Sequence, residues 1–239
     1  MNPIIRKIVL LPINENRLKD LYLTSWSLKH IEGISVCAIL HNLSSEAVLY
    51  AKEILKNIKV DFQIDNSSNN LSEILNKAQM KIKDPVVFYR LDCGDIVHRR
   101  RFDFVPNNNK QLYCHSGLIK YSQGFIVKRY RGFLMQLLRN SLIHSSFIFN
   151  RLEYDTNYKY GQDYELSLRC LMVNNFFFLN RILVLKNMSV KSNTIVNKGI
   201  SIDGTIKAKK ETYSGLKGII IRASLVVEII KKMLWNLKR

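Results

Sequence analysis

The first half of the chain alternates apolar runs of strand length with segments whose apolar residues recur at helical spacing. The apolar runs predict strands over residues 4–11, 34–40, 60–64 and 86–91. The helical spacing between them predicts helices over about 17–30, 44–58 and 71–82. Strands that alternate with helices predict an α/β fold, with a mostly parallel open sheet, helices on both faces and right-handed crossovers.

After residue 95 the pattern is less regular. We expect a short helix or extended turn over 96–104, a short helix over 133–138, a loop over 154–160 and strands over 112–120, 124–128, 142–149 and 176–185. A helix over 162–173 carries Asp163 and Glu165 in its first turn, where negative charge is favoured, and Arg169, which we expect to pair with an acid of its own or a neighbouring helix.

The C-terminal part has a different character. Residues 186–215 are polar and contain glycine, which indicates a linker or a lid. Over residues 216–239, apolar side chains cover more than half of a helix circumference and lysines lie on the rest. A basic amphipathic helix of this kind either contacts a membrane surface or a partner, or packs on its own domain.

Composition narrows the class of protein. Of the 239 residues, 47% are hydrophobic and 23% charged, which is ordinary for a globular domain. No apolar run approaches the ~20 residues that a membrane-spanning helix needs, and residues 1–13 lack the layout of a signal peptide. The four cysteines are scattered without a CxxC pair, which argues against a zinc site and suits a reducing cytosol.

A formal net charge of +18 would attract polyanions such as nucleic acid, anionic lipid or nucleotide diphosphates. The alternative explanation of the net charge is a compositional bias without a functional role, because lysine and arginine are dispersed through most of the chain. Nucleic-acid binding predicts basic residues interleaved with aromatics in one tract, and residues 128–131 are the only candidate.

The strongest candidate for chemistry follows the run 86–91. Asp92 and Asp95 come directly after this strand, with Gly94 between them to allow a tight turn. Ligands of open α/β sheets bind outside the carboxyl ends of strands, so these acids could hold a divalent cation and a diphosphate. A surface turn rich in aspartate and glycine is the alternative.

Five segments, in the expected order, resemble motifs of family-two glycosyltransferases of the GT-A fold, the inverting bacterial kind that builds surface polysaccharides. They are an opening strand with a Pro-x-Asn turn (8–14), a Gly-Leu-Ser-like helix (70–78), a Leu-Asp-x-Asp-like turn (90–95), an Asn-x-x-x-His-x-Ser-like segment (140–146) and a Glu-Asp-Tyr-like helix (161–169). The resemblance covers roughly residues 4–185.

The resemblance implies a GT-A-like catalytic domain over 1–185, with a nucleotide-sugar half (1–95) and an acceptor half (96–185). It implies a glycosyltransferase that moves a sugar from a nucleotide-diphosphate donor to a growing surface glycan, such as lipopolysaccharide or capsule, using Mn²⁺ or Mg²⁺. The residues that it assigns are a general base, Asp163; donor contacts, Pro12, Asn14, Asn76, Asp92 and His144; and metal ligands, Asp92 and Asp95.

Each role has an alternative. Asp163 could instead satisfy backbone N–H groups at a helix start, and Glu165 is the competing base. His144 contacts either the donor phosphate or the acceptor, or is a polar residue bonded within the sheet. The basic residues 99–101 could add positive charge to the cleft if they face it. We expect at least two of them to lie in a solvated turn instead.

The chain also departs from the motifs. Gly94 stands where the family has its usual metal-binding Asp, so the cation is held differently, held weakly or absent. His41 and Asn42 follow the second strand where an Asp often reads the base, a role that Asp65 could take. Gln162 replaces the Glu that usually precedes the catalytic Asp.

We therefore expect a glycosyltransferase, cytoplasmic and peripheral on the inner face of the cell membrane. Its partners would be a nucleotide sugar, a glycan or lipid-linked acceptor and, through residues 216–239, a membrane surface, with no nucleic acid. The alternatives are a catalytically inactive glycosyltransferase-like binding protein and, less favoured, a basic nucleic-acid-binding protein.

Overall fold

The computed structural model describes residues 5–64, 68–83, 85–106, 111–121, 123–138, 140–188 and 198–211, and residues 224, 226, 228, 229 and 232. Its N-terminal half is a parallel sheet in the order β3-β2-β1-β4. The strands are β1 (Arg6–Ile13), β2 (Ile34–Leu40), β3 (Val60–Ile64) and β4 (Val86–Arg90). The connections are a 3₁₀ helix, η1 (Glu15–Asp20), followed by α1 (Leu21–Leu28), and then α2 (Ser45–Leu55) and α3 (Leu71–Met80). The strand–helix alternation predicted for this half is confirmed.

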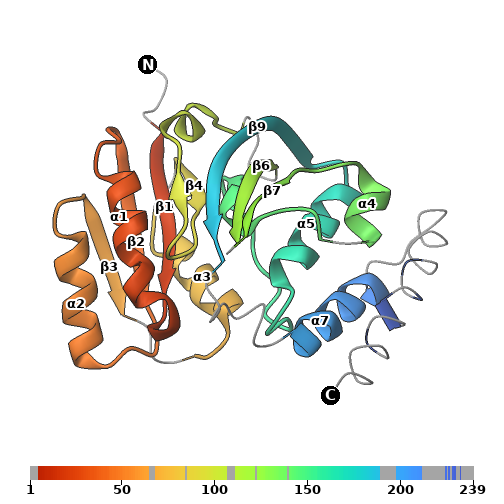
Figure 1. Ribbon diagram of the computed structural model, residues 1–239, viewed down its shortest axis with the longest axis horizontal. Helices are drawn as coiled ribbons and strands as arrows, with labels where there is room; N and C mark the ends of the chain where they lie inside the picture. Colours follow the sequence, from red (N-terminus) through yellow and green to blue (C-terminus); the bar gives the residue numbers. More distant parts are fainter. Residues whose placement is uncertain are drawn as a thin grey trace.

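In the second half of the chain the sheet continues beyond β4 in the order β8-β6-β9-β5, with β7 paired to β6. Strand β8 is antiparallel to β4 and to β6. Strands β6 and β9, which Figure 1 labels, are parallel. The strands are β5 (Ile96–Val97), β6 (Leu112–Tyr121), β7 (Gly124–Lys128), β8 (Ile148–Phe149) and β9 (Phe176–Asn187). The helices are η2 (Arg99–Asp103), α4 (Phe133–Leu138), η3 (His144–Ser146), α5 (Gln162–Met172) and α7 (Lys198–Glu211).

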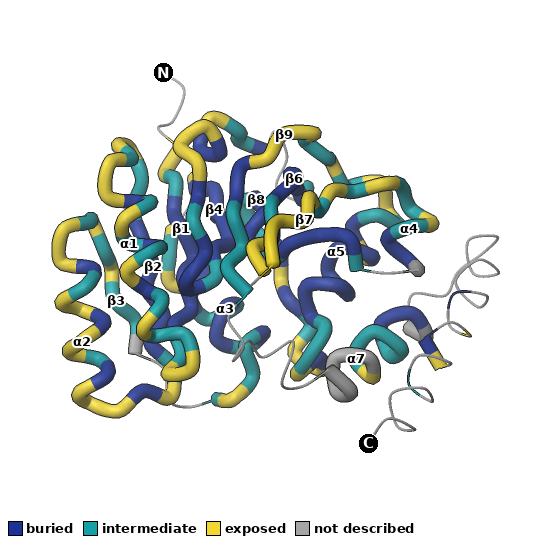
Figure 2. Tube along the Cα trace, viewed as in Figure 1, coloured by how far each residue is buried: buried dark blue, intermediate teal, exposed yellow. Residues whose placement is uncertain are grey.

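Successive residues of the central strands point to opposite faces, and both faces are covered. Val9 and Leu11 of β1 pack with α1 and α2, whereas Ile8 and Leu10 pack with α3 and α5. Figure 2 shows the central strands buried along most of their length. The continuous apolar runs of the sequence therefore follow from helices on both faces of the sheet.

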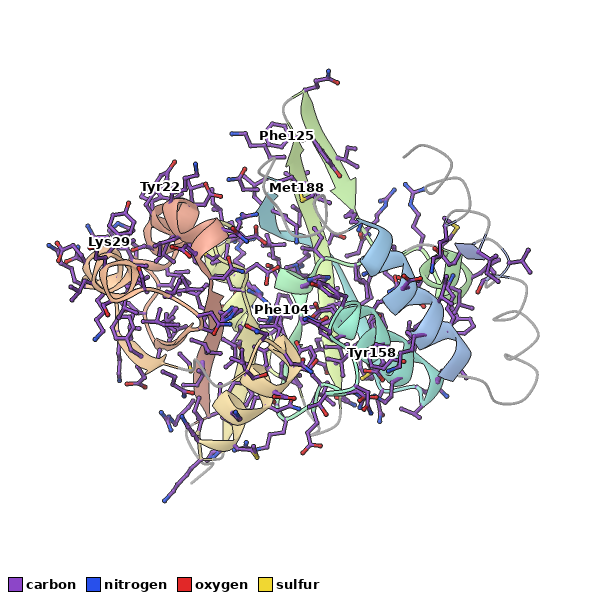
Figure 3. All side chains as sticks on the ribbon, turned by 90° about the horizontal axis from the view of Figure 1, so that it is seen from below. Tyr22, Lys29, Phe104, Phe125, Tyr158 and Met188 are labelled. Atoms are coloured by element: carbon purple, nitrogen blue, oxygen red, sulfur yellow. The ribbon has the colours of Figure 1, made fainter. Side chains whose placement is uncertain are left out.

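A third apolar cluster joins α4, α5 and α7, which gather at one end of the molecule (Figure 1). It contains Leu137, Tyr164, Leu168 and Ala208, and Tyr158, which Figure 3 places beside these helices. The same view shows Phe125 on the projecting β6–β7 hairpin, where 62% of this residue is exposed. No helix of the described residues is long and apolar enough to cross a membrane.

Helices α2 and α3 each begin at a side-chain cap. The Ser44 hydroxyl accepts a hydrogen bond from the Ala47 N–H (3.2 Å) at the start of α2, and the Asn70 amide oxygen accepts one from the Ser72 N–H (3.0 Å) at the start of α3. Helix α5 follows Gly161, whose φ of +78° is the left-handed region that favours glycine.

The strand predicted over 142–149 is wrong for most of its length. Only Ile148 and Phe149 are extended and paired, and residues 144–146 form the turn η3. Polar groups explain the difference, because the Asn140 side chain accepts from the Leu142 N–H and the Ser146 hydroxyl donates to the Ile143 carbonyl.

Within the segment predicted as a linker or lid, residues 198–211 form α7. Residues 216–239 lie mostly outside the described residues. The few that are described are helical, and Ser224 and Glu228 are buried while Val226 and Ile229 are 55% and 43% exposed. Lys209 of α7 donates to the Ser224 carbonyl and the Glu228 carboxylate at 3.3 and 3.2 Å.

Candidate active site

A cleft of about 480 Å³ opens at the carboxyl ends of β1, β2 and β4. This is the usual ligand-binding edge of an open α/β sheet, and the volume falls in the range of small-molecule sites. Residues from distant parts of the chain line it, among them Pro12, Asn14, His41, Asp92, His144 and Asp163.

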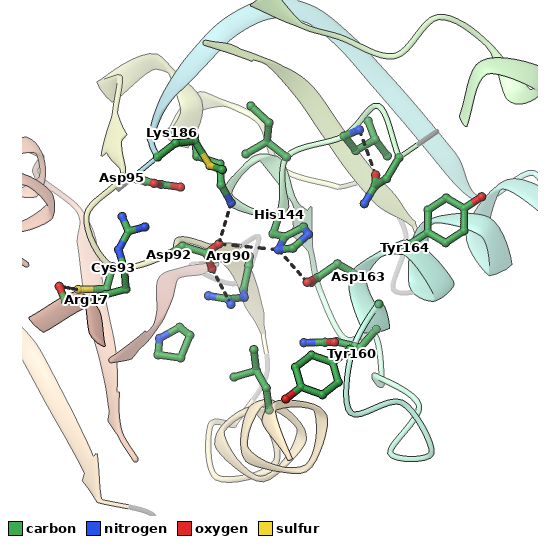
Figure 4. A pocket seen from close by; sticks show the side chains of 18 of the residues that line it. Arg17, Arg90, Asp92, Cys93, Asp95, His144, Tyr160, Asp163, Tyr164 and Lys186 are labelled. Atoms are coloured by element: carbon green, nitrogen blue, oxygen red, sulfur yellow. Dashed lines mark hydrogen bonds and ion pairs between the residues drawn. The ribbon is translucent and has the colours of Figure 1, made fainter. Parts of the chain in front are cut away.

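His144 connects the two acids that the sequence assigned to donor and base. Its Nδ1 lies 2.9 Å from Oδ2 of Asp163 and 3.8 Å from Oδ2 of Asp92 (Figure 4). Asp163 is 97% buried, and among the described residues its Oδ1 has no hydrogen-bond partner. One carboxylate oxygen is therefore fixed by His144, and the other is buried without a hydrogen-bond partner in the described part of the chain.

Asp92 is surrounded by cations. Its Oδ1 lies 2.6 Å from Nη2 of the buried Arg90, and its Oδ2 lies 3.5 Å from Nζ of Lys186. Burial by itself would raise the pKa of the Asp92 carboxyl, but Arg90, followed by Lys186, His144 and Arg17, holds it below its ordinary value. Asp92 is thus a firmly ionised anchor for the basic side chains around it.

Both carboxylate oxygens of Asp95 accept hydrogen bonds from the protein. The Ser145 hydroxyl donates to its Oδ2 (2.6 Å) and the Asn187 N–H to its Oδ1 (3.2 Å). The same Ser145 hydroxyl accepts from the Asp92 N–H (2.9 Å), so Asp95 holds the turn that carries Asp92. Burial, with Asp92 adding to it, raises the pKa of Asp95 to about 6.

This donor set does not fit the cation predicted at Asp92 and Asp95. Asp92 is engaged by Arg90 and Lys186, and both oxygens of Asp95 accept from protein donors. Divalent cations require several free oxygen ligands. Over the described ranges, no group of three His, Cys, Asp or Glu side chains could hold a metal ion. Asp95 is here a positioning residue for the Asp92 turn.

The structure brings most predicted site residues together. Pro12, Asn14, Asp92, His144 and Asp163 line one cleft, and Asp95 borders it although it is 99% buried. Asn76 does not line this cleft. Its amide donates to the Tyr154 carbonyl (2.8 Å) and accepts from the Tyr154 N–H (2.9 Å), so it joins α3 to the segment before α5. Asp65 lies outside the described residues.

The competing base and the basic run lie elsewhere. Glu165 accepts from Nε of Arg169 (2.7 Å), which confirms the predicted pairing of that arginine, and does not line the cleft. Arg99 and Arg100 are exposed. Arg101 is buried and donates through Nη2 to the carbonyls of Arg90 (2.7 Å) and Phe147 (3.0 Å), so it supports the strand end.

Sequence reasoning missed the basic residues of the cleft. Arg17 comes from η1, Arg90 from the end of β4 and Lys186 from the end of β9 (Figure 4). The sequence gives one indication for Arg90, because it is a charged residue in an otherwise apolar strand, two positions before Asp92. Arg17 and Lys186 are 169 positions apart and show no local pattern.

No protein-family model and no curated protein sequence matches the chain. Solved structures of the same fold do. Residues 1–349 of Staphylococcus aureus TarS with UDP-GlcNAc give a TM-score of 0.68 at 10% identity, over 92% of this chain and 70% of that one. The mannosyltransferase PcManGT from Pyrobaculum calidifontis, with GDP-Man and Mn²⁺, gives 0.63 at 12%, over 93% and 69%.

The chain has the GT-A-like fold. Its curled, mostly parallel sheet with helices on both faces matches these structures over more than nine-tenths of its length, which confirms the predicted fold class. It also matches the longer TarS structure, with a TM-score of 0.64, but spans 43% of that chain. At such low identity the likeness establishes the fold alone.

Proposed function

We propose that the protein is a glycosyltransferase that moves a sugar from a nucleoside-diphosphate donor to a glycan hydroxyl, with inversion, and that Asp163 is its general base. The observation that carries the proposal is the state of the Asp163 carboxylate. It is 97% buried, Nδ1 of His144 holds one oxygen at 2.9 Å, and the other oxygen has no partner within the described part of the chain. Basic residues lie at the Asp92 side of the same cleft, where a diphosphate could bind.

This arrangement suits a single displacement. The acceptor hydroxyl gives its proton to the Asp163 carboxylate while its oxygen attacks the anomeric carbon of the donor sugar. The bond from that carbon to the diphosphate oxygen breaks, and the nucleoside diphosphate leaves with the electron pair. Positive charge near the leaving group stabilises it in the transition state, and Arg17, Arg90 and Lys186 supply such charge in this cleft. No step of this proposal passes through a metal ion.

Chemistry and fold likeness support the donor class that we propose, and the acceptor and the site of action are further parts of the proposal. TarS and PcManGT were solved with UDP-GlcNAc and GDP-Man, so a UDP- or GDP-sugar is the donor class that we propose. The acceptor proposed is a growing surface glycan of the lipopolysaccharide or capsule type, reached at the inner face of the cell membrane. Val226 and Ile229 expose apolar surface on the C-terminal segment, which supports a peripheral membrane contact there.

The test is release of nucleoside diphosphate from a panel of UDP- and GDP-sugars, with and without glycan acceptors. Asp163→Asn should lower turnover by about 100- to 10,000-fold, the usual contribution of general acid–base catalysis, and leave nucleotide affinity nearly unchanged. The matched control is Glu165→Gln on the same helix, which should keep most of the turnover because Glu165 pairs with Arg169 outside the cleft.

The alternatives give different results. Nucleotide binding without turnover by the wild-type chain would support an inactive binding protein. Tight, salt-dependent DNA binding without nucleotide affinity would support a nucleic-acid-binding protein. If Glu165→Gln abolishes turnover and Asp163→Asn does not, the assignment of the base is wrong.

A further inference from the structure

The guanidinium group of Arg17 occupies the space beside the Asp92 turn into which a side chain at position 94 would project. Gly94 has a φ of +90°, and a Cβ atom added to it would overlap Nη2 of Arg17 and lie 2.8 Å from Cβ of Asp20. The motif that the turn resembles has its usual metal-binding acid at this position. In this chain the acid is replaced by glycine, and a cation fills the space.

Arg17 is held firmly in this place. Its Nη2 donates to the Asn187 carbonyl (3.0 Å), its Nε lies 3.3 Å from Oδ2 of Asp20, and its own carbonyl accepts from the Cys93 thiol (3.2 Å). The Asn187 N–H in turn donates to Asp95. The end of β9 therefore links η1 to the Asp92 turn, so that the Arg17 side chain, 14% exposed, borders the cleft.

Lys186, the neighbour of Asn187, adds a second cation at the same turn. Its Nζ lies 3.5 Å from Oδ2 of Asp92, and its side chain is 15% exposed. Burial would lower the pKa of Lys186, but Asp92 and Asp95, with Asp163, raise it above its ordinary value, so the amine stays protonated. Figure 4 shows Arg17 and Lys186 around the Asp92–Asp95 turn.

The net charge of the residues that line the cleft is positive, which favours the binding of an anion. Among its described lining residues, five are lysine or arginine and three are aspartate. A cleft that binds a diphosphate through a divalent cation needs free carboxylates to hold that cation. An excess of two positive charges attracts the diphosphate without a cation.

We propose that Arg17 and Lys186 take the place of a divalent cation and bind the donor diphosphate directly, so that nucleotide binding is independent of metal. The inference rests on the proposed function, since it assumes a nucleoside-diphosphate ligand. Arg17 can donate two parallel hydrogen bonds to phosphate oxygens, and Lys186 supplies a point charge. Both act where the negative charge of the leaving group develops.

The experiment is calorimetric titration of the full chain with UDP and with GDP, in EDTA and then in Mn²⁺. The wild-type dissociation constant should agree within about twofold between the two conditions. Arg17→Gln and Lys186→Gln should each weaken binding in EDTA by about 10- to 100-fold, the effect of losing a hydrogen bond to a charged group. Lys19→Gln, which removes an exposed charge from the same 3₁₀ helix, should change it by less than about threefold.

Titration with the corresponding nucleoside separates a diphosphate contact from general damage. Arg17→Gln should leave nucleoside affinity unchanged; an equal loss for nucleoside and nucleotide would make Arg17 a structural residue and overturn the inference. Asp20→Asn breaks the Arg17 ion pair but keeps the Arg17 charge, and it should retain binding in EDTA. Binding that occurs only with Mn²⁺ would overturn the inference and leave the proposed function intact, whereas no binding in either condition would overturn both.

Discussion

Replacing Asp95 by Asn should change how the stability of the protein depends on pH. Asp95 is 99% buried, and its pKa is raised from 3.8 to about 6. Between these values the folded protein holds a proton that the unfolded chain has lost, so the free energy of unfolding falls as pH rises through this window. A shift of about two units corresponds to about 3 kcal/mol. Because Asn does not titrate, Asp95→Asn removes this dependence.

The assay is urea unfolding of wild type and variant, followed by circular dichroism at constant ionic strength. The free energy of unfolding of wild type minus that of Asp95→Asn should be about 2 kcal/mol lower near pH 7 than near pH 4, because at pH 4 part of the effect is already lost. Asp103→Asn, which removes an exposed acid, controls for the loss of one negative charge at the surface. A difference that stays flat, or that rises with pH, would refute the assignment of Asp95 as a buried, destabilised carboxylate.

Two further predictions concern residues that pack beside the cleft, and a third concerns the C-terminal segment. Gly204→Ala places a Cβ atom against the Tyr160 carbonyl, so it should lower the free energy of unfolding by about 1–3 kcal/mol, measured by urea unfolding. It should also lower turnover, measured as the rate of nucleotide release, because the start of α5 is displaced. His144→Ala removes the 2.9 Å contact of Nδ1 with Asp163 and should lower kcat by about 10- to 100-fold with nucleotide affinity retained. An unchanged kcat would exclude His144 as a positioning residue. Ile229→Asp should weaken binding to anionic vesicles about tenfold or more if the C-terminal segment contacts membrane, and equal partitioning would contradict that contact.

The fold could be predicted from the sequence because its signals are local. The strands over 34–40 and 60–64 and the helix over 133–138 begin and end where the apolar pattern predicts. Buried parallel strands read as continuous apolar runs, and the short segments between them leave few topologies.

The acids of the cleft were also predictable, since Asp92 and Asp163 stand in recognisable motifs at the end of a strand and the start of a helix. The basic residues were not. Arg17 enters the cleft only because η1 packs beside the Asp92 turn and hydrogen-bonds to Asn187, 170 positions away. The turn at 144–146 was missed because Ser145 bonds to Asp95 across the site, a tertiary contact that overrides the strand pattern.

The most direct test of the central claim, that the cleft between Asp92 and Asp163 is a nucleotide-sugar site, is the thermal unfolding of the chain against a panel of nucleotide sugars. A donor present at a hundred times its dissociation constant stabilises the folded state by about 2.7 kcal/mol, which raises Tm by about 5–10 °C for a chain of this size. We predict such a shift for at least one UDP- or GDP-sugar, in EDTA as well as in Mn²⁺. A Tm that no nucleotide sugar moves in either condition would contradict the account.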